Sequence, residues 1–260
     1  MKQRFALAAG VLAAAAWVVT AASLSEVSAQ KQAVVEPARI PPEKHPDTSG
    51  PGWVDLLKKD LSNAEFPKGV WFFKDGELTA TKDQNLWTKK VYDNFILDLE
   101  FKTSEGTNSG VIVYCSDPKN WIPNSVEIQI ADDHSPKWAK KSKNWHCAAI
   151  FGHKGPSKSM VKKPGEWNRY TITCRDKMIY VMLNGTQTTV MDMSKFVHQT
   201  RNPDGTPVPP WLKIPKARLP TKGRIGFQGK HAGAPIWFRN IRIRELKQAA
   251  PASGRQEIQK

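Results

Sequence analysis

The chain has 260 residues, of which 40% are hydrophobic and 24% charged, a composition typical of a soluble globular protein with one large domain or two small ones. Its formal net charge is +15, yet the lysines and arginines are spread along the chain and form no zinc finger, basic helical stripe or aromatic RNA-binding motif. The composition therefore favours a solvated basic surface and argues against nucleic acid as a partner.

The first 29 residues have the pattern of a secretory signal peptide. Lys2 and Arg4 form a basic start, an alanine-rich apolar run follows from residue 5 to 22, and small residues at 27–29 allow cleavage after Ala29. We therefore expect residues 1–29 to be removed and the mature protein to be exported, either to the periplasm or to the extracellular space. We expect no stable membrane insertion once the signal is cleaved; an uncleaved anchor is the alternative, because the run is long.

The remaining chain divides by composition. Residues 30–50 are rich in proline and lack an apolar period, which is typical of a linker, and residues 248–260 have the composition of a disordered tail. The folded domain is therefore expected to span residues 51–247. Three cysteines lie in it without zinc-binding spacing, and we interpret them as buried small hydrophobic residues, with one disulfide as the alternative: Cys115, Cys147 and Cys174.

Short strands dominate the expected domain. In the segment 94–102, large apolar residues alternate with acidic ones, and the segments 167–175 and 178–185 form a hairpin pattern with a short turn. No long helical pattern occurs, so the sequence predicts an all-β sandwich or barrel. Further strands are expected at 109–116, 125–131, 146–152, 223–229 and 235–246.

The strand SVEIQIADDH raises a functional question. Val126, Ile128 and Ile130 alternate with Glu127 and Gln129, which predicts one apolar face in the core and one polar face outside it. A carboxylate and an amide on the same outer face are the residue types of a binding cleft. The structural alternative is that Glu127, and likewise Glu100 in the segment 94–102, forms a cross-strand ion pair with a lysine or arginine on a solvated sheet.

The segment 192–222 interrupts the strand rhythm. It contains six of the 19 prolines and a single tryptophan, Trp211. A connection of this length without strands is often a functional lid or rim. A surface insertion held down by Trp211 and Leu212 is the alternative, and the sequence favours neither.

Several motifs occur in an order that resembles the 3-keto-disaccharide hydrolase domain family. The resemblance covers about residues 51–246, and each motif is weak by itself, but their order over one domain is specific. The motifs are GWVDLLKKDLSNAEF at 52–66, TNSGVIV at 107–113, VEIQI at 126–130, KPGEWNRYTI at 163–172, LNG at 183–185 and GRIGFQGKHAGAPIWFRNIRI at 223–243.

The resemblance implies a fold and a chemistry. The fold is a two-sheet antiparallel jelly-roll sandwich of the concanavalin A type, with a cleft on the concave outer face of one sheet. The ligand is an oligosaccharide or a glycoside oxidised at C3. A C3 ketone acidifies the proton on C2, so a base can remove this proton, the C1 aglycone leaves by elimination, and water adds to the resulting enone.

The resemblance and the strand faces together predict the site. Glu127 is the expected base, and His231 is expected to be a second catalytic residue. The two are also the expected ligands of any divalent metal ion, and the identity of a cofactor is left open. Glu100 is expected to supply a second catalytic carboxylate, and Lys230 to polarise the ketone. The residues expected to contact sugar are Gln129, Asn108, Tyr114, Lys230, Gln228 and Trp145.

Two other functions remain open at this stage. A carbohydrate-binding module without turnover would have the same fold and the same cleft. A conventional glucanase ranks last, since its pattern of two Glu flanking an Asp on one strand is absent. Among the tryptophans, we expect Trp167 and Trp237 in the core and the better sugar platforms at Trp121, Trp138 and Trp145.

Overall fold

A computed structural model describes residues 41–247 of the chain. The expected signal peptide at 1–29, most of the expected linker and the expected tail at 248–260 lie outside these residues. Within the described part, no helix is long and apolar enough to cross a membrane.

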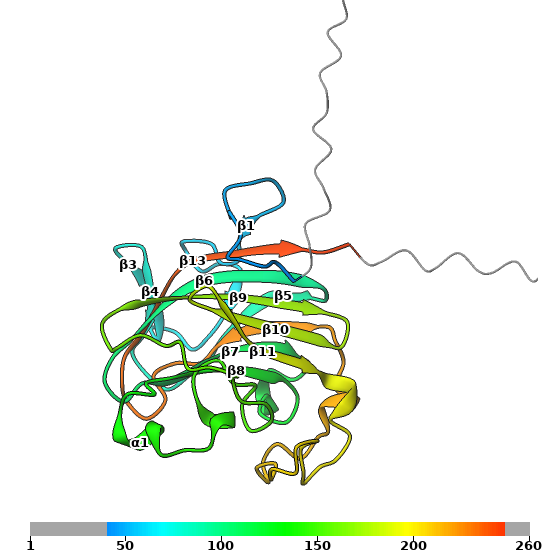
Figure 1. The fold of residues 1–260 in the computed structure, drawn as a ribbon. Coiled ribbons are helices and arrows are strands. Elements are labelled where there is room, and N and C mark those ends of the chain that lie inside the picture. The colour runs from blue at the N-terminus through cyan, green and yellow to red at the C-terminus, as the bar shows by residue number, and fades with distance from the viewer. Residues whose placement is uncertain (1–40, 248–260) are drawn as a thin grey trace, which may run out of the picture. The chain divides into compact units, whose positions relative to one another are not determined.

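The described residues form two antiparallel sheets packed face to face (Figure 1). The larger sheet has eight strands in the order β11-β10-β9-β6-β13-β4-β3, with β1 paired to β13. Its strands are β1 (Val54–Asp55), β3 (Trp71–Lys74), β4 (Glu77–Ala80), β6 (Phe95–Thr103), β9 (Trp167–Arg175), β10 (Met178–Leu183), β11 (Thr186–Asp192) and β13 (Ile236–Glu245).

The smaller sheet has five strands in the order β2-β5-β12-β7-β8. Its strands are β2 (Ala64–Glu65), β5 (Leu86–Tyr92), β7 (Asn108–Cys115), β8 (Val126–Ala131) and β12 (Gly223–Phe227). Only short helices occur among residues 41–247: η1 (Pro118–Asn120), α1 (Pro136–Ala139), η2 (Lys143–Trp145), η3 (Met193–Lys195) and η4 (Lys216–Arg218). The prediction of an all-β, two-sheet antiparallel sandwich is confirmed.

The core forms where the alternating faces of the two sheets meet. On β6, five apolar side chains are fully buried, four of them in the core, and on β8 the three expected residues Val126, Ile128 and Ile130 are also fully buried. Removing these side chains from water is the main favourable term that holds the sheets together. The strand parity predicted for β8 is therefore confirmed, and its polar residues must point away from the core.

The prediction of a strand at 146–152 is wrong. This segment forms only isolated bridges, through Ile150, and otherwise runs as a loop along the outer edge of β8. Its backbone still satisfies the edge, because Phe151 N donates to Glu127 O at 2.9 Å and Ala148 N donates to Gln129 O at 2.9 Å. The loop thus covers an edge that would otherwise be open to another chain.

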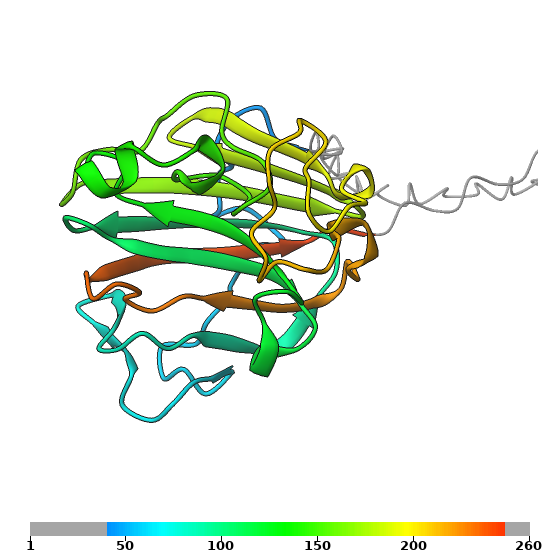
Figure 2. The ribbon, with the colours of Figure 1, turned by 90° about the horizontal axis from the view of Figure 1, so that it is seen from below.

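The segment 192–222 lies beside the smaller sheet (Figure 2). Both sequence interpretations hold in part. Leu212 is buried against Gly152, which anchors the segment, whereas Trp211 remains 49% exposed and forms part of a rim.

Residues 41–50 do not form a free linker. His45 is half-buried against the larger sheet, where its Nδ1 lies 2.8 Å from Thr171 Oγ1 and its Nε2 accepts a hydrogen bond from Gly185 N at 2.8 Å. The ordered domain therefore begins before Pro51. The three cysteines are buried and unpaired, as the first interpretation had them.

The parity of β8 gives a stability prediction. We expect Ile128→Ala to lower the free energy of unfolding by about 2–5 kcal/mol, because a fully buried aliphatic side chain leaves a cavity. Val190→Ala, on the exposed face of β11, is the matched control and should change stability by less than about 0.5 kcal/mol. Equal losses for the two variants in urea unfolding would contradict the assignment of Ile128 to the core.

Candidate functional site: a cleft on the smaller sheet

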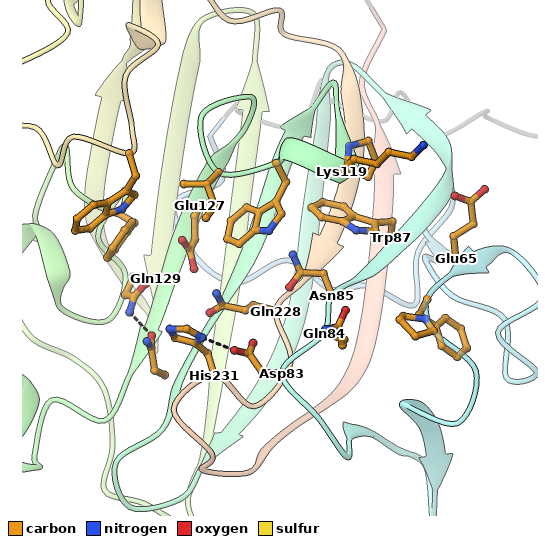
Figure 3. A pocket seen from close by; sticks show the side chains of 18 of the residues that line it. Glu65, Asp83, Gln84, Asn85, Trp87, Lys119, Glu127, Gln129, Gln228 and His231 are labelled. Carbon is orange, nitrogen blue, oxygen red and sulfur yellow. Dashed lines mark hydrogen bonds and ion pairs between the residues drawn. The ribbon is translucent and has the colours of Figure 1, made fainter.

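A cleft of about 840 Å³ lies on the outer face of the smaller sheet. Its floor comes from β5, β7, β8 and β12, and its rim from the loops around them (Figure 3). The lining is Glu65, Phe66, Pro67, Asp83, Gln84, Asn85, Trp87, Asn108, Pro118, Lys119, Trp121, Ile122, Glu127, Gln129, Trp145, Phe151, Trp211, Gln228 and His231. Because the lining contains both indole and amide side chains, the cleft suits a ligand with both apolar faces and hydroxyl groups.

Glu127 lies on the floor of this cleft, as the strand parity predicts. Its side chain crosses the neighbouring strand β7 at Gly110, where a Cβ atom would lie 2.4 Å from Glu127 Oε1. Only glycine leaves room there for the carboxyl group. A similar close approach occurs at Gly226, where a Cβ atom would lie 2.4 Å from the ring of Trp87.

Burial controls the charge of Glu127. Loss of water around the carboxyl group raises its pKa to about 8, and the opposite charge of Lys216 limits this rise. No carboxylate partner or direct ion pair of Glu127 occurs among residues 41–247. A carboxyl group with this pKa can give or take a proton near neutral pH.

A row of amides lies beside Glu127. Gln129 Nε2 donates to Asn108 Oδ1 at 2.9 Å, which fixes both side chains on the cleft floor. Gln228 is almost fully buried, and its Oε1 has no hydrogen-bond partner. A buried amide oxygen without a partner is available to accept a hydrogen bond from a ligand hydroxyl.

His231 forms a pair with Asp83 at the polar end of the cleft. His231 Nδ1 lies 2.6 Å from Asp83 Oδ2, and both side chains are about half exposed. Figure 3 shows the pair on the same side of the cleft as Glu127, Gln129 and Gln228. The carboxylate fixes the orientation of the imidazole ring at this end of the cleft.

Aromatic rings form two pairs along the walls. Trp87 and Trp121 have ring centroids 6.2 Å apart, and Trp145 and Trp211 lie 6.1 Å apart in an edge-to-face arrangement. Phe151 packs against Trp145 at 4.8 Å. Flat faces of this kind pack on the C–H faces of sugar rings. Trp121 and Trp145 line the cleft, as predicted, whereas Trp138 is buried and does not.

The placement of Tyr114 in the cleft is wrong. Simple alternation along β7 puts it on the outer face, but its φ angle is 56° and the pairing of β7 with β12 shifts register next to it. This bulge turns the ring into the core. Tyr114 is fully buried there, and its hydroxyl donates to Asp176 O at 3.2 Å.

The placement of Glu100 beside Glu127 is also wrong. Glu100 lies on β6, whose polar face is the outer face of the other sheet, so the whole sandwich separates the two carboxylates. Glu100 accepts hydrogen bonds from Arg239 Nε at 2.6 Å and Asn240 Nδ2 at 2.7 Å. The ion-pair alternative is therefore the correct one for Glu100.

Three further predictions need correction. Lys230 is partly exposed in the connection before His231 but does not line the cleft. Trp167 and Trp237 are half-buried rather than core residues, and both rings contact Lys102 Nζ, at 4.6 and 5.1 Å.

Sequence reasoning missed Asp83, Trp87 and Lys216. Asp83 lies in a polar loop without any periodic pattern, so no signal marked it. Trp87 pairs with Gly226 across β5 and β12, and only this register shows that the indole has room on the outer face. Lys216 lies in the proline-rich segment 192–222, where the sequence predicts that a lysine is exposed to solvent.

The donor set does not fit a metal site built by protein ligands. Among residues 41–247, no group of three or more His, Cys, Asp or Glu side chains is arranged to hold an ion. The expected pair of Glu127 and His231 supplies two ligands at most, and Asp83 already occupies one nitrogen of His231. We therefore derive no step through a metal ion.

Comparison with known families decides the relationship. A sequence model of the 3-keto-alpha-glucoside-1,2-lyase-like domain matches residues 48–244. The chain belongs to this family. The resemblance noted from the motifs is thus confirmed, and a search of curated proteins found no match.

Solved structures agree with membership of the lyase-like family. A proposed glycosyl hydrolase from Parabacteroides distasonis is 56% identical, with a TM-score of 0.73, and the match covers 75% of this chain and 99% of that one. Two further proposed glycosyl hydrolases from the same organism are 22% and 24% identical, with TM-scores of 0.58 and 0.55. They cover 75% of this chain in each case, and 89% and 84% of their own. These two show the fold alone.

Family and cleft together make this lyase-like chain a carbohydrate-related domain with sugars as its expected ligands.

The contact between Gly110 and Glu127 gives a prediction. We expect Gly110→Ala to push the carboxyl group further into water, so that the pKa of Glu127 falls from about 8 toward the usual range of a glutamate. Carbon-detected NMR of the Glu127 carboxyl group measures this shift. Gly50→Ala, whose Cβ atom has its nearest neighbour at 3.9 Å, is the control. An unchanged Glu127 titration in Gly110→Ala would show that β7 does not hold the carboxyl group.

Proposed function

We propose that the protein is an exported enzyme that cleaves 3-keto-glycosides in this cleft by removal of the C2 proton and elimination of the aglycone. Family membership supports the substrate class, and the N-terminal sequence of residues 1–29 supports export. The observation that carries the proposal is the carboxyl group of Glu127, held on the cleft floor with its pKa raised to about 8.

Glu127 acts as the base in this proposal. Its carboxylate takes the proton from C2, which the adjacent C3 ketone has made acidic. The electrons of the C2–H bond form the C1–C2 double bond as the C1–O bond breaks, and the products are an enone and the free aglycone alcohol. Such a transfer needs a base whose pKa lies near the operating pH, because a carboxylate with a much lower pKa would hold the proton too weakly.

His231 supplies the proton that the leaving oxygen needs. Asp83 Oδ2 lies 2.6 Å from one ring nitrogen and orients the ring, and a proton on the other nitrogen passes to the leaving oxygen as the C1–O bond breaks. The amides of Gln129, Asn108 and Gln228 then bind the hydroxyl groups and the oxygen on C3, where negative charge develops. Water can add to the enone after the aglycone has left.

The remaining carboxylates of the cleft disfavour a conventional glycosidase. That mechanism needs two carboxyl groups on opposite sides of one glycosidic bond. Asp83 is paired with His231, and Glu65 is paired with Arg224 at the far side of the cleft from Glu127 (Figure 3). Glu127 is therefore the one lining carboxyl group, among residues 41–247, without an ion-pair partner.

A carbohydrate-binding module without turnover is the second candidate. Four indoles line the cleft, from Trp87, Trp121, Trp145 and Trp211, and they would give affinity for sugars without any chemistry. The two candidates differ in the response to Glu127→Gln. In a binding module this change leaves the carboxamide able to bind hydroxyl groups, so affinity changes little.

Turnover of a 3-keto-disaccharide tests the proposal. We expect the mature protein to release the aglycone sugar, and Glu127→Gln to slow this release by about 10²–10⁴-fold, since it removes the base. Glu100→Gln, on the other sheet, should have nearly full activity. The double variant Glu127→Gln/His231→Ala should lose little more than the slower single variant, because the two residues act in one step. If the wild type binds sugar but releases no aglycone, the enzymatic proposal is wrong and the binding-module proposal takes its place.

The pH profile follows from the raised pKa of Glu127. The active form is the carboxylate, so kcat/KM should rise with pH through an inflection near 8; about one molecule in a hundred has the base at pH 6 and about half at pH 8. Initial rates between pH 6 and 9 measure this profile. A rise near pH 8 that persists unchanged in Glu127→Gln would mean that another group sets the profile.

A further inference from the structure

Lys216 is a buried lysine in the segment 192–222, at the start of η4. It is 2% exposed, and its Nζ donates to the backbone oxygen of Ser125 at 2.8 Å; Ser125 directly precedes β8 and lies two residues before Glu127. Lysine is almost never fully buried without a partner, because the ammonium group loses its hydration. One carbonyl oxygen satisfies only one of its three donors, so the burial needs a further explanation.

The charged surroundings of Lys216 are sparse. Within residues 41–247, no carboxylate lies within ion-pair distance of its Nζ. Two titratable groups interact with it through space, Glu127 and His153. Burial keeps His153 neutral by lowering its pKa to about 3, and its Nδ1 lies 2.9 Å from Asn202 Oδ1. Glu127 is therefore the one nearby group that can carry the opposite charge.

We propose that Lys216 is a positioning residue for Glu127, a buried cation that stabilises the ionised carboxyl group on the cleft floor. The ammonium group is fixed to the backbone directly before the strand that carries Glu127, so its place relative to the carboxyl group depends on this backbone and not on a flexible side chain in water. The structural part of this proposal stands on the burial and the hydrogen bond; its consequence for catalysis rests on the proposed function.

The two groups act on each other reciprocally. Burial raises the pKa of Glu127 and lowers that of Lys216 to about 8, and the attraction between the charges opposes both shifts. The pair therefore titrates in coupled steps, and removal of one charge must move the other. The other titratable residues that line the cleft lie along its walls: Glu65, Asp83, Lys119 and His231.

NMR titration of the two side chains tests the coupling without any substrate. Lys216→Met keeps the length of an apolar chain and removes the charge, so the pKa of Glu127 should rise by about one unit or more. Lys213→Met, the same change at an exposed lysine of the same segment, should leave Glu127 unchanged. Lys216→Arg, which retains the charge, should keep the titration closer to that of the wild type.

The reciprocal measurement protects the test against misfolding. In Glu127→Gln, the Cε resonance of Lys216 should titrate at a lower pH than in the wild type, because the lysine has lost its counter-charge. This variant leaves Lys216 in place, so it decides the question even where Lys216→Met fails to fold. Unchanged titration of Lys216 in Glu127→Gln would overturn the proposal.

Turnover separates this inference from the proposed function. If both hold, Lys216→Met shifts the rise of kcat/KM to higher pH and lowers kcat at pH 7, with KM nearly unchanged. A purely structural role would lower the yield of folded protein without moving the profile. Wild-type protein that shows the coupled titration but no turnover of a 3-keto-disaccharide would retire the enzymatic proposal and leave the role of Lys216 intact.

Discussion

The burial of Val126, Ile128 and Ile130 between the two sheets is the constraint on which the site depends. Because side chains alternate along a strand, this burial forces Glu127 and Gln129 onto the opposite face, and a register shift of one residue would place a carboxyl group in the core. The loop at 147–151 holds the same strand from its free edge through the backbone of Glu127 and Gln129. The hydrophobic core thus positions polar side chains that it does not itself contact.

A second constraint is the height of the cleft floor. Side chains on the outer face of a sheet normally stand away from it, and they would leave little room for a ligand. Gly110 and Gly226 remove this obstacle, since the side chain of Glu127 packs flat over Gly110 and that of Trp87 packs flat over Gly226. The carboxyl group therefore stays close to the sheet, where it is poorly solvated. Its raised pKa is a consequence of that position, with the adjoining lysine as the opposing influence.

The sequence predicted what depends on local alternation and failed where the register or the sheet assignment matters. Parity placed the core and cleft faces of β8, and the order of motifs identified the family. Parity failed at Tyr114, because a left-handed residue at a bulge exchanges the two faces of β7. It also failed to separate Glu100 from Glu127, because two strands with identical alternation can belong to opposite sheets. Asp83 and Lys216 come from loops, whose path no periodic pattern encodes.

The residues of the site come from two parts of the molecule, the smaller sheet and the segment 192–222. The smaller sheet supplies Glu127 and the amides, whereas the segment 192–222 supplies Trp211 at the rim and Lys216 in the interior. Leu212 anchors this segment against Gly152, between those two residues in the chain, so the rim and the buried amine are fixed by one packing contact. A change in the segment can therefore alter both the wall of the cleft and the buried cation that we propose acts on Glu127, while the strands keep their register. In physical terms, the sheet determines where the carboxyl group lies and how far burial raises its pKa, and the segment supplies the cation that opposes this rise.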